Sequence, residues 1–168
     1  MTTFIVNSAG RFFTPDSEYA AALGKSGVLA EADKREGDKA TPLGAYRLRR
    51  VLYRADRVEK PETGLPVRAL RNDDGWCDAP DDPAYNRPVC LPYPASCEAL
   101  TREDELYDIV VILAHNDAPP VPGLGSAIFL HCAKPGYPPT LGCVALARAD
   151  LEAVLKRAQP GDLLEIRR

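Results

Sequence analysis

Sixteen prolines and twelve glycines are spread along the whole chain, and they limit what it can fold into. Proline interrupts helices and central strands, and both residues favour turns, so this spread predicts many short elements. A mostly β fold suits that pattern better than a helix bundle. The chain has 168 residues, a length that one hydrophobic core can serve, so we expect residues 1–168 to form a single domain.

The charge balance bears on the choice of partner. The chain carries 21 basic and 24 acidic residues, a formal net charge of -3, so it has no overall positive field to attract a polyphosphate backbone. We therefore expect no nucleic-acid partner. The first residues contain no cationic segment followed by a long apolar stretch, and no apolar run is long enough to cross a bilayer. These features predict no membrane partner and favour the cytoplasm.

Cysteine usage excludes a complete disulfide framework. The five cysteines are an odd number, so at least one is unpaired in a monomer. None forms a CxxC pair, and with two histidines in the chain no spacing indicates a closed zinc site. We expect neither a metal nor any other cofactor.

Periodicity predicts where the regular elements lie. Continuous apolar runs rich in β-branched and aromatic residues predict central strands buried on both faces, at 109–114 and 127–130. An imperfect apolar stripe predicts a short C-terminal helix over 148–158, ended by Pro160-Gly161, and a last strand at 163–167. Three further stretches predict strands of an amino-terminal β-meander, with a loop at 34–46 inside it: 3–6, 26–30 and 45–51.

The segment 59–96 has a different composition, with many prolines and the acidic run DAPDDP. It leaves little room for a helix or a central strand, so we expect a long irregular insertion. Such a loop is either a binding rim or lid, or a segment that only wraps the surface. After it, CEALTREDELY at 97–107 predicts a short helix with Ser96 as its N-cap.

One segment holds candidates for nucleophilic catalysis. A buried strand reaches His131, and a turn-rich loop then leads to Gly142 and Cys143. A catalytic cysteine needs a partner such as an imidazole to activate its thiol, which His131 would supply. Backbone N–H groups around Leu141, Gly142 and Cys143 would bind a developing oxyanion. Gly142 has no side chain that could block the incoming carbonyl group. From the residues alone, an inert buried cysteine and a structural histidine remain the alternative.

Two ordered motifs resemble a known family. The run IFLHCAKPGYPPTLGCVAL at 128–146 resembles the active-site signature of the L,D-transpeptidase catalytic domain, also called the YkuD domain. The matching positions are His131, Thr140, Gly142 and Cys143. The earlier run KATPLGAYRL at 39–48 looks like the family's Thr-Pro-x-Gly-x-aromatic segment, represented by Thr41, Pro42, Gly44 and Tyr46.

This resemblance carries expectations of fold and function. It implies a YkuD-like β-sandwich or barrel without a cofactor, in which Cys143 forms a thioester on peptidoglycan stem peptides or muropeptides. The thioester would form on the L-centre of the third stem residue, typically diaminopimelate. Family members are expected in the periplasm or cell wall, in contrast to the cytoplasmic expectation above.

The departures from the family pattern keep the reaction open. Many members have His immediately before the Gly-Cys pair and Arg two residues after it, where this chain has Leu141 and Ala145. Transpeptidation is therefore one alternative, and an L,D-carboxypeptidase or endopeptidase that uses water as acceptor is another. A non-catalytic peptidoglycan-binding module is the third.

Several other residues are candidate substrate contacts, each with a structural alternative. An aromatic floor and a guanidinium in the insertion would suit a peptide with carboxylates, and the residues that would provide them are Trp76, Tyr85, Asn86 and Arg87. His115 would line the same cleft or cap its strand, and Arg148 lies just past the nucleophile. Thr140 belongs to the family signature. Cys132 should point away from its neighbour His131 on a strand and is interpreted as structural.

Overall fold

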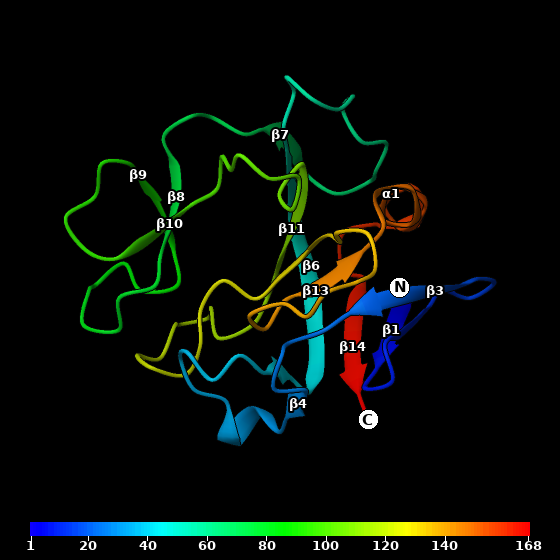
Figure 1. The fold of residues 1–168 in the computed structure, drawn as a ribbon, viewed down its shortest axis with the longest axis horizontal. Coiled ribbons are helices and arrows are strands. Elements are labelled where there is room, and N and C mark those ends of the chain that lie inside the picture. The colour runs from blue at the N-terminus through cyan, green and yellow to red at the C-terminus, as the bar shows by residue number, and fades with distance from the viewer.

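The computed structural model describes all 168 residues and consists largely of short β-strands joined by turns (Figure 1). A 3₁₀ turn, η1 (Glu31–Asp33), and one α-helix, α1 (Arg148–Arg157), complete it. The strands are β1 (Thr3–Asn7), β2 (Arg11–Phe13), β3 (Glu18–Ala22), β4 (Val28–Leu29), β5 (Thr41–Pro42), β6 (Gly44–Tyr53), β7 (Val67–Ala69), β8 (Asp74–Cys77), β9 (Pro88–Cys90), β10 (Cys97–Ala99), β11 (Ile109–Leu113), β12 (Phe129–Cys132), β13 (Val144–Leu146) and β14 (Leu163–Arg167). The predicted mainly β fold with a short C-terminal helix is confirmed.

Nine of the strands form one sheet that closes on itself. Its order is β11-β12-β13-β3-β2-β1-β14-β6-β7, and β11 also pairs with β6. The ten-residue β6 makes this closure possible, because its first half pairs with β14 and its second half with β11 and β7. A register shift at Ile112 and Leu113 marks the place where the pairing of β6 and β11 is irregular.

The central strands are buried on both faces, as the sequence predicted. In β11, Ile109, Val111 and Leu113 belong to the larger core, while Val110 and Ile112 belong to a second cluster. Side chains on a strand alternate between faces, so β11 separates the two cores. β12 lies between β11 and β13 in the same sheet. It therefore occupies a central place.

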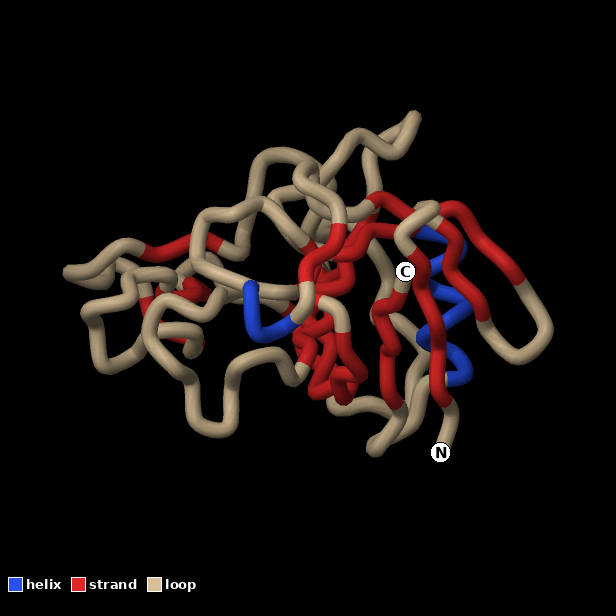
Figure 2. Tube along the Cα trace, turned by 90° about the horizontal axis from the view of Figure 1, so that it is seen from below, coloured by secondary structure: helices blue, strands red, loops and turns tan.

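The predicted helix covers the larger core. Its stripe Leu151, Val154 and Leu155 is fully buried, and Figure 2 shows α1 lying alongside the strands of the large sheet. The amide of Ala158 closes the last turn on the carbonyl of Leu155 before Pro160 stops the helix. The structure contains no helix long and apolar enough to cross a membrane.

The amino-terminal meander is built differently from the prediction. It consists of β1, β2 and β3, which pair in sequence order. The predicted strand at 26–30 is reduced to β4, which pairs only with β5, and β6 joins the opposite side of β14. The predicted loop at 34–46 contains β5 and the start of β6.

The segment that follows β6 is more regular than predicted. The stretch 59–96 contains β7, β8 and β9, and a separate three-stranded sheet has the order β10-β8-β9 (Figure 1). The predicted helix at 97–107 is wrong, because β10 takes its backbone partners from β8. Ser96 is not an N-cap: its hydroxyl is hydrogen-bonded to the Asp78 carboxylate at 2.6 Å. Whether 59–96 is an insertion into the family fold stays a prediction.

Candidate active site

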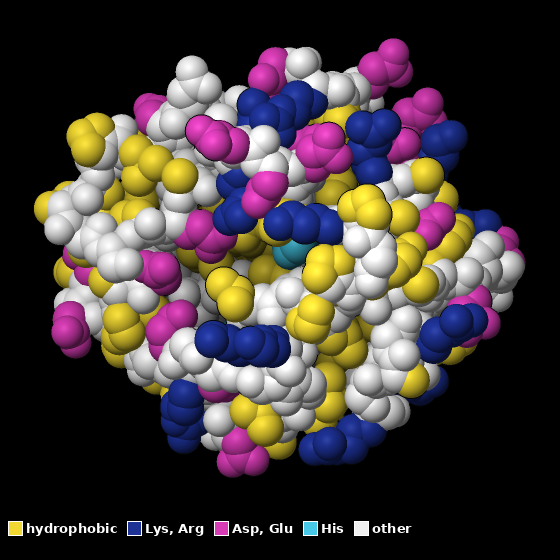
Figure 3. All heavy atoms as spheres, viewed as in Figure 1, with side chains coloured by type: hydrophobic (Ala, Val, Ile, Leu, Met, Phe, Trp, Pro, Cys, Tyr) yellow, Lys and Arg dark blue, Asp and Glu magenta, His cyan; other side chains and the backbone are white.

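Cys143 and His131 line the same hollow between the large sheet and the β10-β8-β9 sheet. The hollow measures about 630 Å³. In the space-filling view a histidine side chain is visible at its bottom, bordered by apolar, basic and acidic groups (Figure 3). His131 comes from β12, and Cys143 stands immediately before β13, the parallel neighbour of β12. The strand pairing therefore brings the two predicted residues together.

The Cys143 side chain is nearly enclosed and belongs to the second core cluster. Its Sγ accepts a hydrogen bond from the Phe129 amide at 3.3 Å and donates one to the Ala127 carbonyl at 3.2 Å. Burial raises the pKa of the thiol to about 12, with a further contribution from the nearby Glu98 carboxylate. Cys143 is thus a protonated thiol in the substrate-free protein.

The His131 ring is held in one orientation. Nδ1 lies 2.8 Å from the Cys132 carbonyl oxygen, and because a carbonyl only accepts, Nδ1 carries the proton. Nε2 is then a free acceptor. Burial lowers the pKa of His131 to about 4, so the ring is neutral at physiological pH. The ring also packs edge-on against Tyr107, with centroids 5.3 Å apart. Cys132 lies on the opposite face in the larger core, as predicted.

Thr140 shapes the turn that carries Cys143. Its hydroxyl donates to the Cys143 carbonyl at 2.7 Å and accepts from the Gly142 amide at 3.1 Å. The Cys143 N–H itself makes no hydrogen bond within the protein. The side chain of Thr140 therefore fixes the backbone around Cys143, and the Cys143 N–H stays without a partner in the protein.

Gly142 differs from its predicted role. Its N–H is engaged by Thr140, so it is not a free oxyanion donor. Glycine is required there for another reason, since φ is +136° and an added Cβ would lie 2.9 Å from the Ala40 carbonyl oxygen. The glycine permits close approach of two backbone segments rather than access for a substrate.

The two sequence motifs support each other in space. Thr41 of the earlier motif accepts a hydrogen bond from the Gly24 amide at 2.8 Å, and Gly24 forms an isolated bridge with Thr140. Ala40, next to Thr41, is the residue that contacts Gly142. The segment 39–48 thus packs against the turn that carries Cys143 and supports it.

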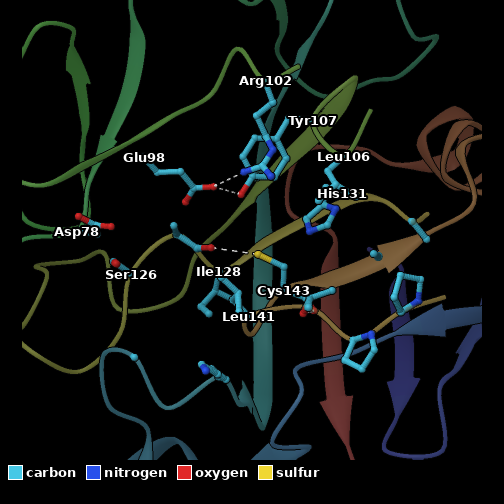
Figure 4. A pocket seen from close by; sticks show the side chains of 18 of the residues that line it. Asp78, Glu98, Arg102, Leu106, Tyr107, Ser126, Ile128, His131, Leu141 and Cys143 are labelled. Atoms are coloured by element: carbon cyan, nitrogen blue, oxygen red, sulfur yellow. Dashed lines mark hydrogen bonds and ion pairs between the residues drawn. The ribbon is translucent and has the colours of Figure 1, made fainter. Parts of the chain in front are cut away.

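The hollow is also lined by a polar cluster of Glu98, Arg102 and Tyr107, which the sequence did not predict. The Tyr107 hydroxyl donates to the Glu98 carboxylate, and Arg102 lies 3.8 Å from the same carboxylate and 5.1 Å from the Tyr107 ring centroid (Figure 4). Two hydrogen bonds from Arg102 to Asp104 hold the guanidinium in place. Sequence analysis missed this cluster because it placed these residues on a helix, and no spacing indicates that β10 would bring them to His131.

The residues predicted in the 59–96 segment do not line this hollow, which receives only Asp78 from that segment. Trp76 and Asn86 are buried and bonded to each other, with the indole N–H 2.9 Å from Asn86 Oδ1. Tyr85 is buried with its hydroxyl on Glu36 at 2.6 Å. Arg87 is exposed and borders a separate hollow. Trp76 belongs to the same buried apolar cluster as Cys143. None of the three buried side chains lines the hollow, so they do not form the predicted aromatic floor.

His115 and Arg148 also lie outside the hollow. His115 is buried with its ring edge-on to Tyr46, and burial lowers its pKa to about 4. Arg148 is exposed in the first turn of α1, 3.6 Å from Glu152. Thr140, by contrast, borders the Cys143 hollow as well as shaping its turn.

Comparison with known proteins adds two findings. A family model described as the L,D-transpeptidase catalytic domain, YkuD, matches residues 2–166. The crystal structure of L,D-transpeptidase 1 from Mycobacterium tuberculosis matches with a TM-score of 0.45 and 12% sequence identity, over 99% of this chain and 62% of that chain. No curated protein matches the sequence.

Proposed function

This chain belongs to the L,D-transpeptidase catalytic domain family, and we propose that it transfers acyl groups of peptidoglycan stem peptides through a thioester on Cys143. The observation that carries the proposal is the placement of Cys143 and an oriented, neutral His131 in one hollow. The acyl donor would be a stem peptide that transfers the carbonyl group of the L-centre of its third residue to the Cys143 sulfur.

The first step is attack of the Cys143 sulfur on the donor carbonyl carbon. The thiol proton passes to Nε2 of His131, the acceptor that the Nδ1 contact with Cys132 leaves free. The thiol pKa of about 12 and the imidazole pKa of about 4 mean that an ion pair is not the resting state. Proton transfer would therefore accompany attack, once the sulfur turns from the Ala127 carbonyl toward the ring.

The tetrahedral intermediate needs a donor for its oxygen, and the unengaged Cys143 N–H supports that role. Collapse breaks the bond to the amine of the terminal D-residue, which takes the proton from His131. The product is the Cys143 thioester. An amine or a water molecule then attacks its carbonyl carbon while His131 again accepts the proton, and the bond to the Cys143 sulfur breaks as that proton returns to the thiolate.

The charges around the hollow support a peptide that carries both carboxylates and an amine. Basic side chains at the lining are Lys34, Lys39, Arg102 and Lys134, and acidic ones are Glu36, Asp78 and Glu98. Arg102 is already oriented by Asp104 and Tyr107, so little conformational entropy is lost when it pairs with a carboxylate. We assign it the recognition of a donor carboxylate.

Hydrolysis of the thioester is the second candidate reaction. At the rim, Leu141 occupies the place before Gly142 and is 79% exposed. It offers no side-chain base to an acceptor amine, which favours water. In that case the chain would act as an L,D-carboxypeptidase or endopeptidase.

The test is mass spectrometry of the protein and its products after incubation with purified tetrapeptide muropeptides. We expect a thioester adduct on Cys143, followed by dimeric muropeptides if an amine is the acceptor or by tripeptides if water is. Cys143→Ser should abolish turnover, since an alcohol is ionised far less readily than a thiol. His131→Ala should slow acylation by at least ~10²-fold, the usual effect of losing a general base.

A non-catalytic binding module would behave differently. It would bind muropeptides without any adduct, and a carbapenem-type β-lactam would leave Cys143 unmodified. Substantial turnover by folded Cys143→Ser would remove this thiol from the mechanism, and circular dichroism of both variants provides the folding control.

A further inference from the structure

We propose that Cys77 and Cys97 are a redox-reactive thiol pair that a small-molecule disulfide, such as oxidised glutathione, converts into an intrachain disulfide in the wall of the Cys143 hollow. The inference concerns a second pair of cysteines and is independent of the proposed acyl transfer. It rests on strand register, hydrogen-bond pattern and accessibility.

Cys77 on β8 and Cys97 on β10 are direct partners across an antiparallel pair. The backbone bonds on either side of them run from the Asp78 amide to the Ser96 carbonyl at 3.2 Å and from the Leu100 amide to the Asp74 carbonyl at 3.0 Å. This pattern places the two cysteines at a non-hydrogen-bonded position of the ladder.

That position brings the two thiols within reach of each other. Cα atoms of such a pair are about 4.5 Å apart, and the side chains share one face of the sheet. A disulfide needs a Cα separation of about 4.4–6.8 Å, so the bond can form without a large movement of either strand. The presence of Cys77 beside Cys97 also contributes to the raised pKa of the Cys97 thiol, after burial as the main cause.

The two thiols have different access to solvent. Cys97 is half-buried and borders the hollow, whereas Cys77 is fully buried. Cys97 is thus the thiol that meets a reagent, and Cys77 the thiol that resolves the adduct. Cys90 does not compete for Cys77, because it stands opposite Asp74 on the other side of β8.

The chemistry is two successive thiol–disulfide exchanges. The Cys97 thiolate attacks oxidised glutathione, forming a mixed disulfide and releasing one glutathione thiolate. The Cys77 thiol then loses its proton and attacks the Cys97 sulfur, releasing the second glutathione. Two protein thiols are oxidised, one glutathione disulfide is reduced to two thiols, and protons balance on the released glutathione.

The bond would form next to residues of the candidate active site. Asp78 follows Cys77 and Glu98 follows Cys97 in the chain, and both border the hollow. Joining β8 to β10 fixes these two carboxylates relative to each other and closes the loop 78–96 at its base.

The experiment uses the Cys90→Ser chain, fully reduced and then incubated with oxidised glutathione at mildly alkaline pH. Free thiols are blocked by alkylation, and the chain is cleaved before its aspartates. Cleavage at Asp78 and Asp82 separates the peptide of Cys77 from that of Cys97, so a disulfide between them is identified directly by mass. We expect the loss of two thiols per chain, one joined peptide pair and no retained glutathione.

Matched variants test the division of roles. In Cys77→Ser, Cys97 should accumulate a glutathione adduct because no thiol resolves it, and in Cys97→Ser neither a disulfide nor an adduct at Cys77 should appear. Cys97→Ser changes only a half-buried residue. Loss of folding would therefore not explain the absence of a disulfide or adduct in that variant. The proposal is overturned if the reduced chain keeps both thiols, or if Cys97 pairs with Cys143 instead.

Discussion

Thr140→Val removes the hydroxyl that organises the turn at Cys143 while keeping the β-branched shape. Two hydrogen bonds disappear, one to the Cys143 carbonyl and one from the Gly142 amide. At about 1 kcal/mol net for each, the unfolding free energy should fall by about 2 kcal/mol. For a chain of this length that loss lowers Tm by about 4–8 °C.

The same change should slow acylation, because the backbone beside the Cys143 sulfur and its amide is no longer held. A misplacement of about 1 Å costs roughly 10²-fold in rate, so we expect a loss between about tenfold and a hundredfold. Urea unfolding measures the stability, and the rate of β-lactam adduct formation measured by mass spectrometry reports the chemistry.

Thr140→Ser is the matched control, since it keeps the hydroxyl and loses one methyl group. It should retain both hydrogen bonds and most of the rate. If the serine and valine variants lose stability and rate equally, the hydroxyl does not organise the turn. Equal rates in valine and the parent chain would refute its link to catalysis.

The other predictions concern ionisation and substrate charge. Alkylation of Cys143 by iodoacetamide in the free protein should rise with pH without a neutral plateau, because burial raises the thiol pKa to about 12; a plateau near neutrality would reveal a resting ion pair with His131. Arg102→Gln should raise KM for a carboxylate-bearing stem peptide by roughly tenfold, the effect of one charge-assisted hydrogen bond. Arg87 lies outside the hollow, so Arg87→Ala should leave KM unchanged. If KM rises in Arg87→Ala and not in Arg102→Gln, the substrate binds at the hollow bordered by Arg87 instead. The two histidines have folded pKa values of about 4, below the ordinary value of 6.5, so their neutral forms stabilise the fold above about pH 6.5. That stability, up to about 3 kcal/mol for each histidine, is lost as pH falls from 6.5 toward 4. Urea unfolding at pH 6.5 and at pH 4 should therefore show that His115→Gln loses less unfolding free energy between the two pH values than the parent chain does.

The elements that the sequence predicted well are those whose pattern is complete within a few residues. The apolar run of β11 and the apolar stripe of α1 each indicate burial within a few residues, and Pro160-Gly161, which ends α1, lies directly after it in the chain. The wrong helix at 97–107 shows the limit of that logic. Its charged residues fit a polar helical face, but β8 offers hydrogen-bond partners that no local pattern reveals.

The candidate site divides in the same way. His131, Thr140 and Cys143 were identified from a contiguous signature, and the parallel pairing of β12 with β13 explains why they meet. Arg102 and Tyr107 were missed, and Trp76 and Arg87 were assigned to a hollow that they do not line. Composition indicates which side chains suit a substrate, but it cannot say which wall they face.

By itself, the sequence determined the fold class, the helix, the central strands and the pair of residues proposed to do the chemistry, because those depend on local patterns and one ordered motif. The tertiary structure alone decided the closure of the sheet, the pocket wall and the protonation of Cys143 and His131. The physical reason is that pKa values and pocket linings depend on which distant segments exclude water from a group, and chain closure through β6 and β11 brings those segments together.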